Sequence, residues 1–284
     1  MLKHLTHHTN RILYAVILFG LVITSIAIAW IALASCNFFY GVWHDHGGIG
    51  DGIERFAPEN KYKQHFAHTS KQQREQLFWL TVKAIHLNGR GLDELRYSVE
   101  LPSNVTVSKR TKADTSAQAS AKNYSDYLYR TPEIIHLQDV AKLVNAMLLF
   151  ALAVLLVTVI ALVWLKRRLS ASRKSLTRAP LSIGSKAHVA LELPSIKRQW
   201  AYIAGAVTIL FIVLMVFGPE RVFNQLHIWI FPKDHQWFFY YQESLMSTMM
   251  LAPRLFAFIA ALWLALSLCV IVILQNCLQK WINP

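Results

Sequence analysis

The chain has 284 residues, of which 54% are hydrophobic, and a formal net charge of +13. Many nucleic-acid-binding proteins carry such a charge, but here the basic residues are localised and no nucleic-acid-binding motif accompanies them, which argues against a nucleic-acid partner. The apolar residues are concentrated in four runs, each near the ~20 residues that a helix needs to cross a bilayer. The runs do not alternate as membrane β-strands do, so we predict four transmembrane helices.

The first apolar run covers residues 11–35 and has no charged residue after Arg11. At its end, residues 33–36 (Leu-Ala-Ser-Cys) resemble the lipobox at which bacterial lipoprotein precursors are cleaved. The apolar stretch before it is longer than the roughly 7–15 residues of a signal-peptide core. We therefore predict a retained transmembrane helix, with cleavage at Cys36 as the alternative.

The segment between the first two apolar runs has the composition of a water-soluble domain, with 13 basic and 11 acidic residues over residues 37–137. Its five glycines at residues 41–53 predict a loop. Residues 70–86 predict a helix with Ser70 as its N-cap. These features indicate a folded cap that begins with a loop and a helix.

The second half of this cap contains the signals of a small sheet. Residues 96–108 alternate and are rich in β-branched side chains, which predicts a strand or hairpin with a turn at residues 102–104. Residues 110–123 are polar and small, which predicts a loop. Ordered structure is expected to resume at residues 124–129.

The second transmembrane helix has a clear predicted start. Thr131 suits the N-cap, Pro132 suits the first helical position, and Glu133 suits the positive end of the helix dipole. His136 and Asp139 follow Glu133 at steps of three residues, so all three lie on one side of the helix.

Three interpretations of His136 remain open at this point. It is an interfacial histidine bonded to Asp139 or Glu133, a catalytic base held by one of these carboxylates, or a metal ligand. Glu-x-x-His occurs in helical di-metal sites, but such sites need carboxylates from facing helices. The third and fourth apolar runs have none, which argues against a metal.

The distribution of charge predicts how the chain is oriented. Residues 166–198 hold nine Lys or Arg, whereas residues 219–254 hold three. The positive-inside rule therefore places residues 166–198 in the cytoplasm. With four spans, both termini are then cytoplasmic and the cap lies outside.

The last external loop is rich in aromatic residues, with eight between Phe223 and Tyr241. Such residues form belts at membrane interfaces whatever the function. However, the predicted topology brings His136 and His227 to the same outer boundary, where an aromatic-lined pocket would hold an amphiphile. His235 lies between Asp234 and Gln236, and we expect it to be solvated.

The remaining histidines and the cysteines give weaker signals. We interpret His4, His7, His8, His44 and His46 as solvated polar residues rather than metal ligands. Cys36, Cys269 and Cys277 indicate neither a disulfide framework nor a zinc site.

The predicted fold class is an all-α membrane protein, with four transmembrane helices and an extracytoplasmic α+β cap between helices 1 and 2. The predicted segments are the N-terminus with helix 1 (1–36), the cap (37–132), helix 2 (133–166), a basic cytoplasmic loop (167–198), helix 3 (199–218), an aromatic-rich external loop (219–252), and helix 4 with the C-terminus (253–284).

Two sequence blocks resemble signatures of one family, the lipoprotein intramolecular transacylases. Residues 133–140 (EIIHLQDV) resemble that family's E-x-x-H-[LM]-x-D-V signature at the start of its second helix. Residues 222–231 (VFNQLHIWIF), followed by an aromatic run at 237–239 and by Pro253, are similar to its second signature. The four spans and the outer cap also agree. The cap and the cytoplasmic loop are longer than usual, and residues 129–132 depart from the family's usual lead-in.

The resemblance implies an acyltransferase of the bacterial cytoplasmic membrane that acts on a diacylated lipoprotein among membrane lipids, without a cofactor or metal. It implies that His136 is the base, oriented by Asp139 or Glu133, and that His227 donates to the tetrahedral oxygen or the leaving group. Which histidine has which role stays open. The substrate-binding residues that we expect are Tyr127, Trp229, Phe231, Trp237, Phe238 and Arg254. The alternatives are a non-catalytic lipid-binding or assembly protein and a metal-dependent membrane hydrolase.

Overall fold

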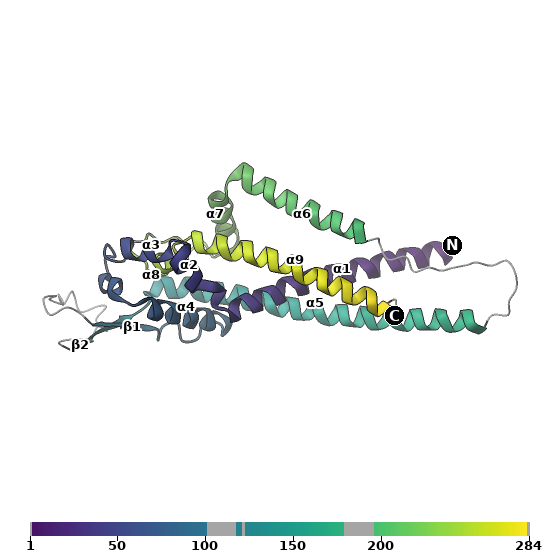
Figure 1. Ribbon diagram of the computed structural model, residues 1–284, viewed down its shortest axis with the longest axis horizontal. Helices are drawn as coiled ribbons and strands as arrows, with labels where there is room; N and C mark the ends of the chain where they lie inside the picture. The colour runs from purple at the N-terminus through teal and green to yellow at the C-terminus, as the bar shows by residue number, and fades with distance from the viewer. Residues whose placement is uncertain (1, 101–117, 121–122, 179–195, 283–284) are drawn as a thin grey trace. The chain divides into compact units, whose positions relative to one another are not determined.

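The computed structural model describes residues 2–100, 118–120, 123–178 and 196–282. The long helices in these ranges are α1 (Leu2–Ser35), α5 (Thr131–Arg178), α6 (Ile196–Phe217) and α9 (Arg254–Ile282) (Figure 1). The chain divides into two compact units. One comprises Met1–Ala29, Leu149–Val222 and Ala265–Pro284, and the other Trp30–Leu148 and Phe223–Leu264.

Four helices in the described part of the chain are long and apolar enough to cross a membrane, which confirms the predicted fold class. The spans are Ile12–Ser35, Thr131–Arg168, Lys197–Phe217 and Arg254–Trp281. Many of their large apolar side chains are exposed, which suits contact with lipid. The predicted loop 167–198 is helical at both ends, because α5 continues to Arg178 and α6 begins at Ile196.

In the first unit, α1 and α5 pack closely together. The buried side chains of their interface are Tyr14, Ile17, Leu21 and Leu165. A Cβ atom at Gly20 would lie only 1.8 Å from Oγ1 of Thr158, so a glycine is needed there. Gln275 of α9 donates a hydrogen bond to Gln199 of α6 at 3.2 Å. Close approach at a small residue and a polar contact are typical of helix packing in membranes.

The second unit contains the cap. Its short helices are η1 (Asn37–Phe39), α2 (Tyr40–His46), α3 (Ile49–Phe56), η2 (Gln64–His68), α4 (Lys71–His86) and α8 (Leu245–Met250). In this unit, α2 packs against α4, and α3 packs against α8. The predicted helix at 70–86 is confirmed as α4, and the Ser70 hydroxyl caps it by accepting a hydrogen bond from the Gln73 N–H at 3.2 Å.

The prediction of a loop over residues 41–53 is wrong, because the segment forms most of α2 and α3. Gly48 has a positive φ of 75° and makes the turn between the two helices. Gly41 and Gly52 serve close packing instead. A Cβ at Gly41 would lie 2.6 Å from Oε1 of Glu75, and one at Gly52 would lie 2.6 Å from Cδ1 of Leu251.

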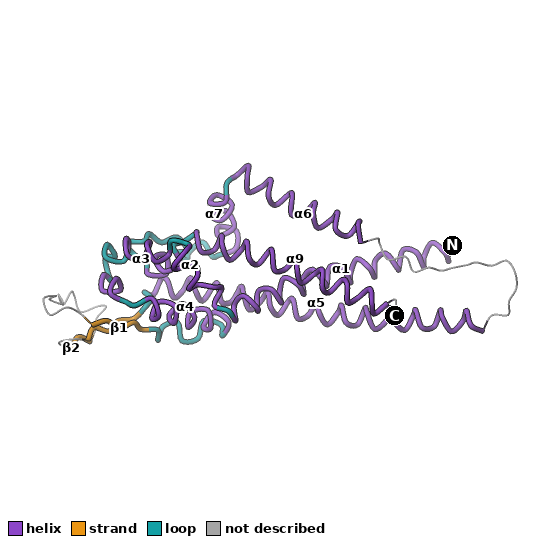
Figure 2. Tube along the Cα trace, in the orientation of Figure 1, coloured by secondary structure: helices purple, strands orange, loops and turns teal. Residues whose placement is uncertain are grey.

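The cap also contains a small antiparallel sheet with the order β1-β3-β2 among the described strands, drawn in orange in Figure 2. The strands are β1 (Arg96–Glu100), β2 (Gln118–Ser120) and β3 (Asn123–Tyr127). Arg96 pairs with Tyr127, and Glu100 with Asn123. The predicted turn at 102–104 lies outside the described residues. The loop predicted for 110–123 is wrong at 118–120 and 123, and its remaining residues lie outside them too.

Candidate active site

The start of α5 positions the first candidate residues. The N–H of Ile134 donates to the carbonyl of Arg130 at 3.0 Å, so Arg130 is the N-cap rather than the predicted Thr131. Glu133 accepts a hydrogen bond from the N–H of Arg130 at 2.9 Å, as the third helical residue does in a capping box. This arrangement fixes the first turn and the direction of the side chains that follow.

Glu133 is completely buried and ties α5 to α8. Its Oε1 atom accepts hydrogen bonds from the Ser244 hydroxyl at 2.7 Å and from the Met246 N–H at 3.0 Å. Its Oε2 atom binds the residue before the helix. In the described part of the chain, Glu133 has no hydrogen bond to His136, and its contacts hold the first turn of α5 against the start of α8.

His136 lies one turn further along α5 and is 6% exposed. Its ring centroid is 5.0 Å from that of Phe231, 6.1 Å from that of Phe239 and 6.1 Å from that of His227. Its buried Nδ1 atom has no hydrogen-bond partner among the described residues. An unpaired buried acceptor is tolerated better than an unpaired N–H, so the geometry favours a proton on Nε2.

His227 comes to the same place from α7 (Pro219–Ile230). Its Nδ1 atom is 2.8 Å from the carbonyl oxygen of Phe223. A carbonyl only accepts hydrogen bonds, so Nδ1 carries the proton and the Nε2 lone pair of the neutral ring is free to accept one. Burial lowers the pKa of His227 below its usual 6.5, and the hydrogen bond to Phe223 partly opposes this.

Asp139 has partners that the sequence did not reveal. Its carboxylate pairs with His235 and, at 3.1 Å, with Lys142. It has no hydrogen bond to His136. His235 was expected to be solvated, and its side chain is 32% exposed, but it also pairs with Asp139 and so joins the aromatic loop to α5. The two residues are 96 positions apart, and no local sequence signal connects them.

The aromatic residues nearest the histidines belong to this loop and to α7. The ring centroid of His227 is 4.0 Å from that of Phe223, 5.2 Å from that of Phe231 and 5.1 Å from that of Trp237. Phe238 packs edge-on against Trp237 with the ring centroids 6.0 Å apart, and it is 52% exposed. Three of the six predicted substrate-binding residues therefore belong to the histidine cluster.

The other three predicted substrate-binding residues have different surroundings. Trp229 is 73% exposed and has no ring contact within the described chain. Tyr127 lies in β3 beneath the guanidinium of Arg96, whose Cζ atom is 3.7 Å from the ring centroid. Arg254 lines a separate cavity in the same unit. The described residues contain no group of three or more His, Cys, Asp or Glu that would hold a metal ion.

Comparison with known families identifies the chain. A family model described as lipoprotein intramolecular transacylase Lit matches residues 108–256, just over half of the chain, and this segment includes His136 and His227. The chain belongs to the lipoprotein intramolecular transacylase family. It is thus an acyltransferase, integral to a membrane, that acts on lipoproteins.

A solved structure resembles this transacylase along its length. It is an in meso structure of the membrane integral lipoprotein intramolecular transacylase Lit from Bacillus cereus, in a form with one histidine replaced by arginine. The match covers 99% of this chain and 95% of that chain, with a TM-score of 0.59 and 13% identity. At this identity the likeness shows the fold alone. None of the curated proteins matches the chain.

Proposed function

We propose that the chain moves the sn-2 acyl chain of a lipoprotein's diacylglyceryl group to the α-amine of the same N-terminal cysteine, which gives a lyso-form lipoprotein. Membership of the transacylase family supports this reaction. The observation that supports assigning this reaction to particular residues is the proximity of His136 and His227, whose ring centroids lie 6.1 Å apart among aromatic side chains.

We also propose that the chain lies in the bacterial cytoplasmic membrane with both termini in the cytoplasm. The histidine site and the cap then lie on the outer face. The nine Lys or Arg of residues 166–198 support this orientation through the positive-inside rule.

The covalent geometry of the substrate sets the main task of the enzyme. Attack of the amine on the ester closes an eight-membered ring through N, Cα, Cβ, S, two glyceryl carbons, the ester oxygen and the carbonyl carbon. Such rings are disfavoured by strain and entropy, so holding one folded conformer provides much of the acceleration. Phe231, Phe239 and Trp237 surround the histidines with rigid apolar walls that suit this task.

His227 is proposed as the proton carrier. The α-amine has a pKa of about 8, so a fraction of it is neutral and nucleophilic at neutral pH. When it attacks the ester carbonyl, the new N–C bond leaves a positive charge on nitrogen. The free Nε2 atom of neutral His227 takes the excess proton and then passes it to the glyceryl oxygen as the C–O bond breaks.

His136 is proposed as the hydrogen-bond donor to the tetrahedral oxygen. A proton on Nε2, favoured by the unpartnered buried Nδ1 atom, lets the neutral ring stabilise the developing negative charge without losing the proton. These roles are the reverse of those that the family resemblance implies, and the hydrogen bond between His227 and Phe223 and the unpartnered Nδ1 atom of His136 support them.

The product identifies the reaction. The purified protein would be incubated with a synthetic diacylglyceryl lipopeptide that has a free α-amine, with and without excess EDTA, and the product analysed by tandem mass spectrometry. We expect an N-acyl monoacylglyceryl product of unchanged mass in both conditions. An unchanged substrate would reject the transacylase reaction, whereas a lighter lyso-lipopeptide with a free amine and a released fatty acid, formed only without EDTA, would instead indicate a metal-dependent hydrolase.

A further inference from the structure

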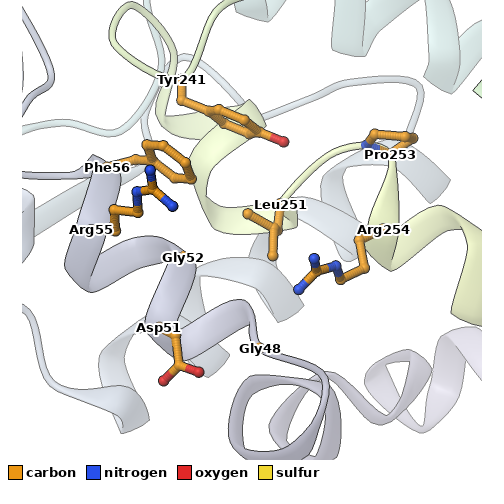
Figure 3. A pocket seen from close by; sticks show the side chains of 9 residues that line it. All are labelled: Gly48, Asp51, Gly52, Arg55, Phe56, Tyr241, Leu251, Pro253 and Arg254. Atoms are coloured by element: carbon orange, nitrogen blue, oxygen red, sulfur yellow. The ribbon is translucent and has the colours of Figure 1, made fainter.

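The second unit contains a cavity of about 380 Å³ that is separate from the histidine site. Figure 3 shows the side chains that line it, with Arg254 reaching from the start of α9 toward α3 and Arg55 lying beside Phe56. The lining residues that carry charge are Arg55, Arg254 and Asp51. Among the described residues, none of those that line it has a ring contact or a hydrogen bond with His136 or His227.

The charged groups of this cavity lack protein partners. Within the described residues, the side chains of Arg55, Arg254 and Asp51 have neither a hydrogen bond nor an ion pair. Arg55 has only its own neighbour Phe56, whose ring centroid is 5.1 Å from the guanidinium carbon. Two fixed positive charges and one negative charge leave the cavity with a net positive charge that suits an anion.

The backbone around the cavity adds to this character. α3 begins at Ile49, and its N-cap residue Gly48 offers no side chain to satisfy the first N–H groups. A Cβ at Gly48 would lie 2.8 Å from Nη1 of Arg254, so the guanidinium reaches the very start of the helix. The positive end of α3 beside the guanidinium of Arg254 matches the oxygens of a phosphate, which arginine binds in a bidentate manner. Arg55 lies in the last turn of the same helix and adds a second positive charge to the lining of the cavity.

The place of Arg254 in the chain indicates where such a phosphate comes from. It is the first residue of the span Arg254–Trp281, so it marks the end of a membrane helix, where lipid head groups lie. Phe56 and Tyr241 are stacked with their centroids 4.4 Å apart, and Leu251 lies in the same wall. The cavity therefore combines cations with apolar surface, as an amphiphilic ligand requires.

We propose that this cavity binds the phosphate of an anionic phospholipid head group and so anchors the cap to the membrane surface. The lining of this cavity shares no residue with the histidine cluster, and the proposed intramolecular transfer needs no phospholipid donor. A failure of either proposal therefore leaves the other standing.

Native mass spectrometry of the delipidated full-length protein tests this proposal. Phosphatidylglycerol and phosphatidylcholine of equal chain length would be titrated in parallel, with inorganic phosphate as a competitor. We expect phosphatidylglycerol to bind in preference, and the double variant Arg55→Gln/Arg254→Gln to lose about tenfold in affinity, which is ~1.4 kcal/mol. Lys233→Gln removes the same kind of charge from an exposed loop position and is expected to bind as the wild type does.

A third variant tests the cavity by an expected gain, rather than a loss, of affinity for phosphatidylglycerol. Asp51→Asn removes the carboxylate that repels a phosphate and is expected to tighten phosphatidylglycerol binding, which misfolding cannot imitate. Equal binding of both lipids, or unchanged binding by the double arginine variant, would overturn the proposal. If inorganic phosphate competed at concentrations similar to those of the lipid, the ligand of this cavity would be free phosphate rather than a phospholipid.

Discussion

The histidine cluster and the arginine cavity belong to the same unit but have opposite physical characters. The cluster is lined by aromatic rings, and His136 in it is 6% exposed. The cavity is lined by Arg55, Arg254 and Asp51, all exposed and without side-chain hydrogen bonds among the described residues. Neutral groups that exchange protons suit acyl transfer, whereas permanent charges suit the binding of an anion. We therefore propose that acyl transfer and lipid binding take place at two separate sites.

The largest effect is expected for His227. Replacement by Gln keeps a polar side chain but removes the proton acceptor, so we expect the transacylation rate to fall by about 10³-fold, within the range for general-base catalysis. The rate is measured by single-turnover conversion of the lipopeptide. Phosphatidylglycerol binding is the control, and we expect it to stay at the wild-type level. A loss of both transacylation and phosphatidylglycerol binding would show that the histidine cluster and the arginine cavity are not independent.

Transacylation at the histidine cluster and lipid binding at the arginine cavity are expected to depend differently on pH. Below pH 8 the neutral fraction of the α-amine falls about tenfold per pH unit, so the rate falls as the pH is lowered. Because burial lowers the pKa of His227 from its usual 6.5, the neutral form of the histidine predominates at pH 6.5, and we expect the slope of the logarithm of the rate against pH to rise from one toward two only below this pH. A slope of two that begins at pH 6.5 would contradict this. Phosphatidylglycerol binding should be constant from about pH 6 to pH 9, because arginine does not titrate there.

Asp139 tests whether the aromatic loop must be held against α5. Asp139→Asn weakens the contacts with His235 and Lys142, and we expect about a tenfold loss of kcat/KM as the walls around His136 loosen. Lys142→Gln is the matched control. The Lys142 side chain is 71% exposed, and exposed ion pairs contribute ~0–1 kcal/mol, so the variant should retain most of the activity. If kcat/KM fell equally in both variants, the loss in Asp139→Asn would be due to the contact with Lys142 rather than to the contact with His235.

Glu133 is expected to affect stability more than chemistry. Its buried carboxylate accepts hydrogen bonds from Arg130, Ser244 and Met246, and Glu133→Gln leaves at least one donor unpaired. We expect a loss of roughly 1–3 kcal/mol of stability, measured by thermal unfolding in detergent. Glu243→Gln, at a partly exposed pair with Lys61, is the control and should unfold as the wild type does. Unchanged stability combined with lost activity would instead support the predicted role of Glu133 in orienting His136.

The parts of the fold that depend on local signals were predictable from the sequence. Hydropathy predicted the four spans, and Ser70 predicted the start of α4. The Gly-rich segment 41–53 was predicted wrongly, because glycine is favoured in loops but is used here where backbone and side chains approach closely.

The candidate site was predictable only in part, because some of its contacts join residues that are far apart in the sequence. Topology brought His136 and His227 to one boundary, and their rings lie side by side in the structure. The pairing of Asp139 with His235 depends on the path of the loop between α7 and α8, which no local pattern encodes. Arg254 lines a cavity formed with α3, and its predicted contact with the substrate stays a prediction.

The most direct test of the histidine pair is a side-by-side comparison of His136→Gln and His227→Gln on the same diacylglyceryl lipopeptide. Glutamine retains an N–H donor but is not a base at neutral pH, so it replaces part of the proposed role of His136 and none of the role of His227. We predict that tandem mass spectrometry detects the N-acyl product with His136→Gln, more slowly than with the wild type, and not with His227→Gln on the same timescale. Equal rates for the two variants, or the opposite order, would contradict the proposed roles.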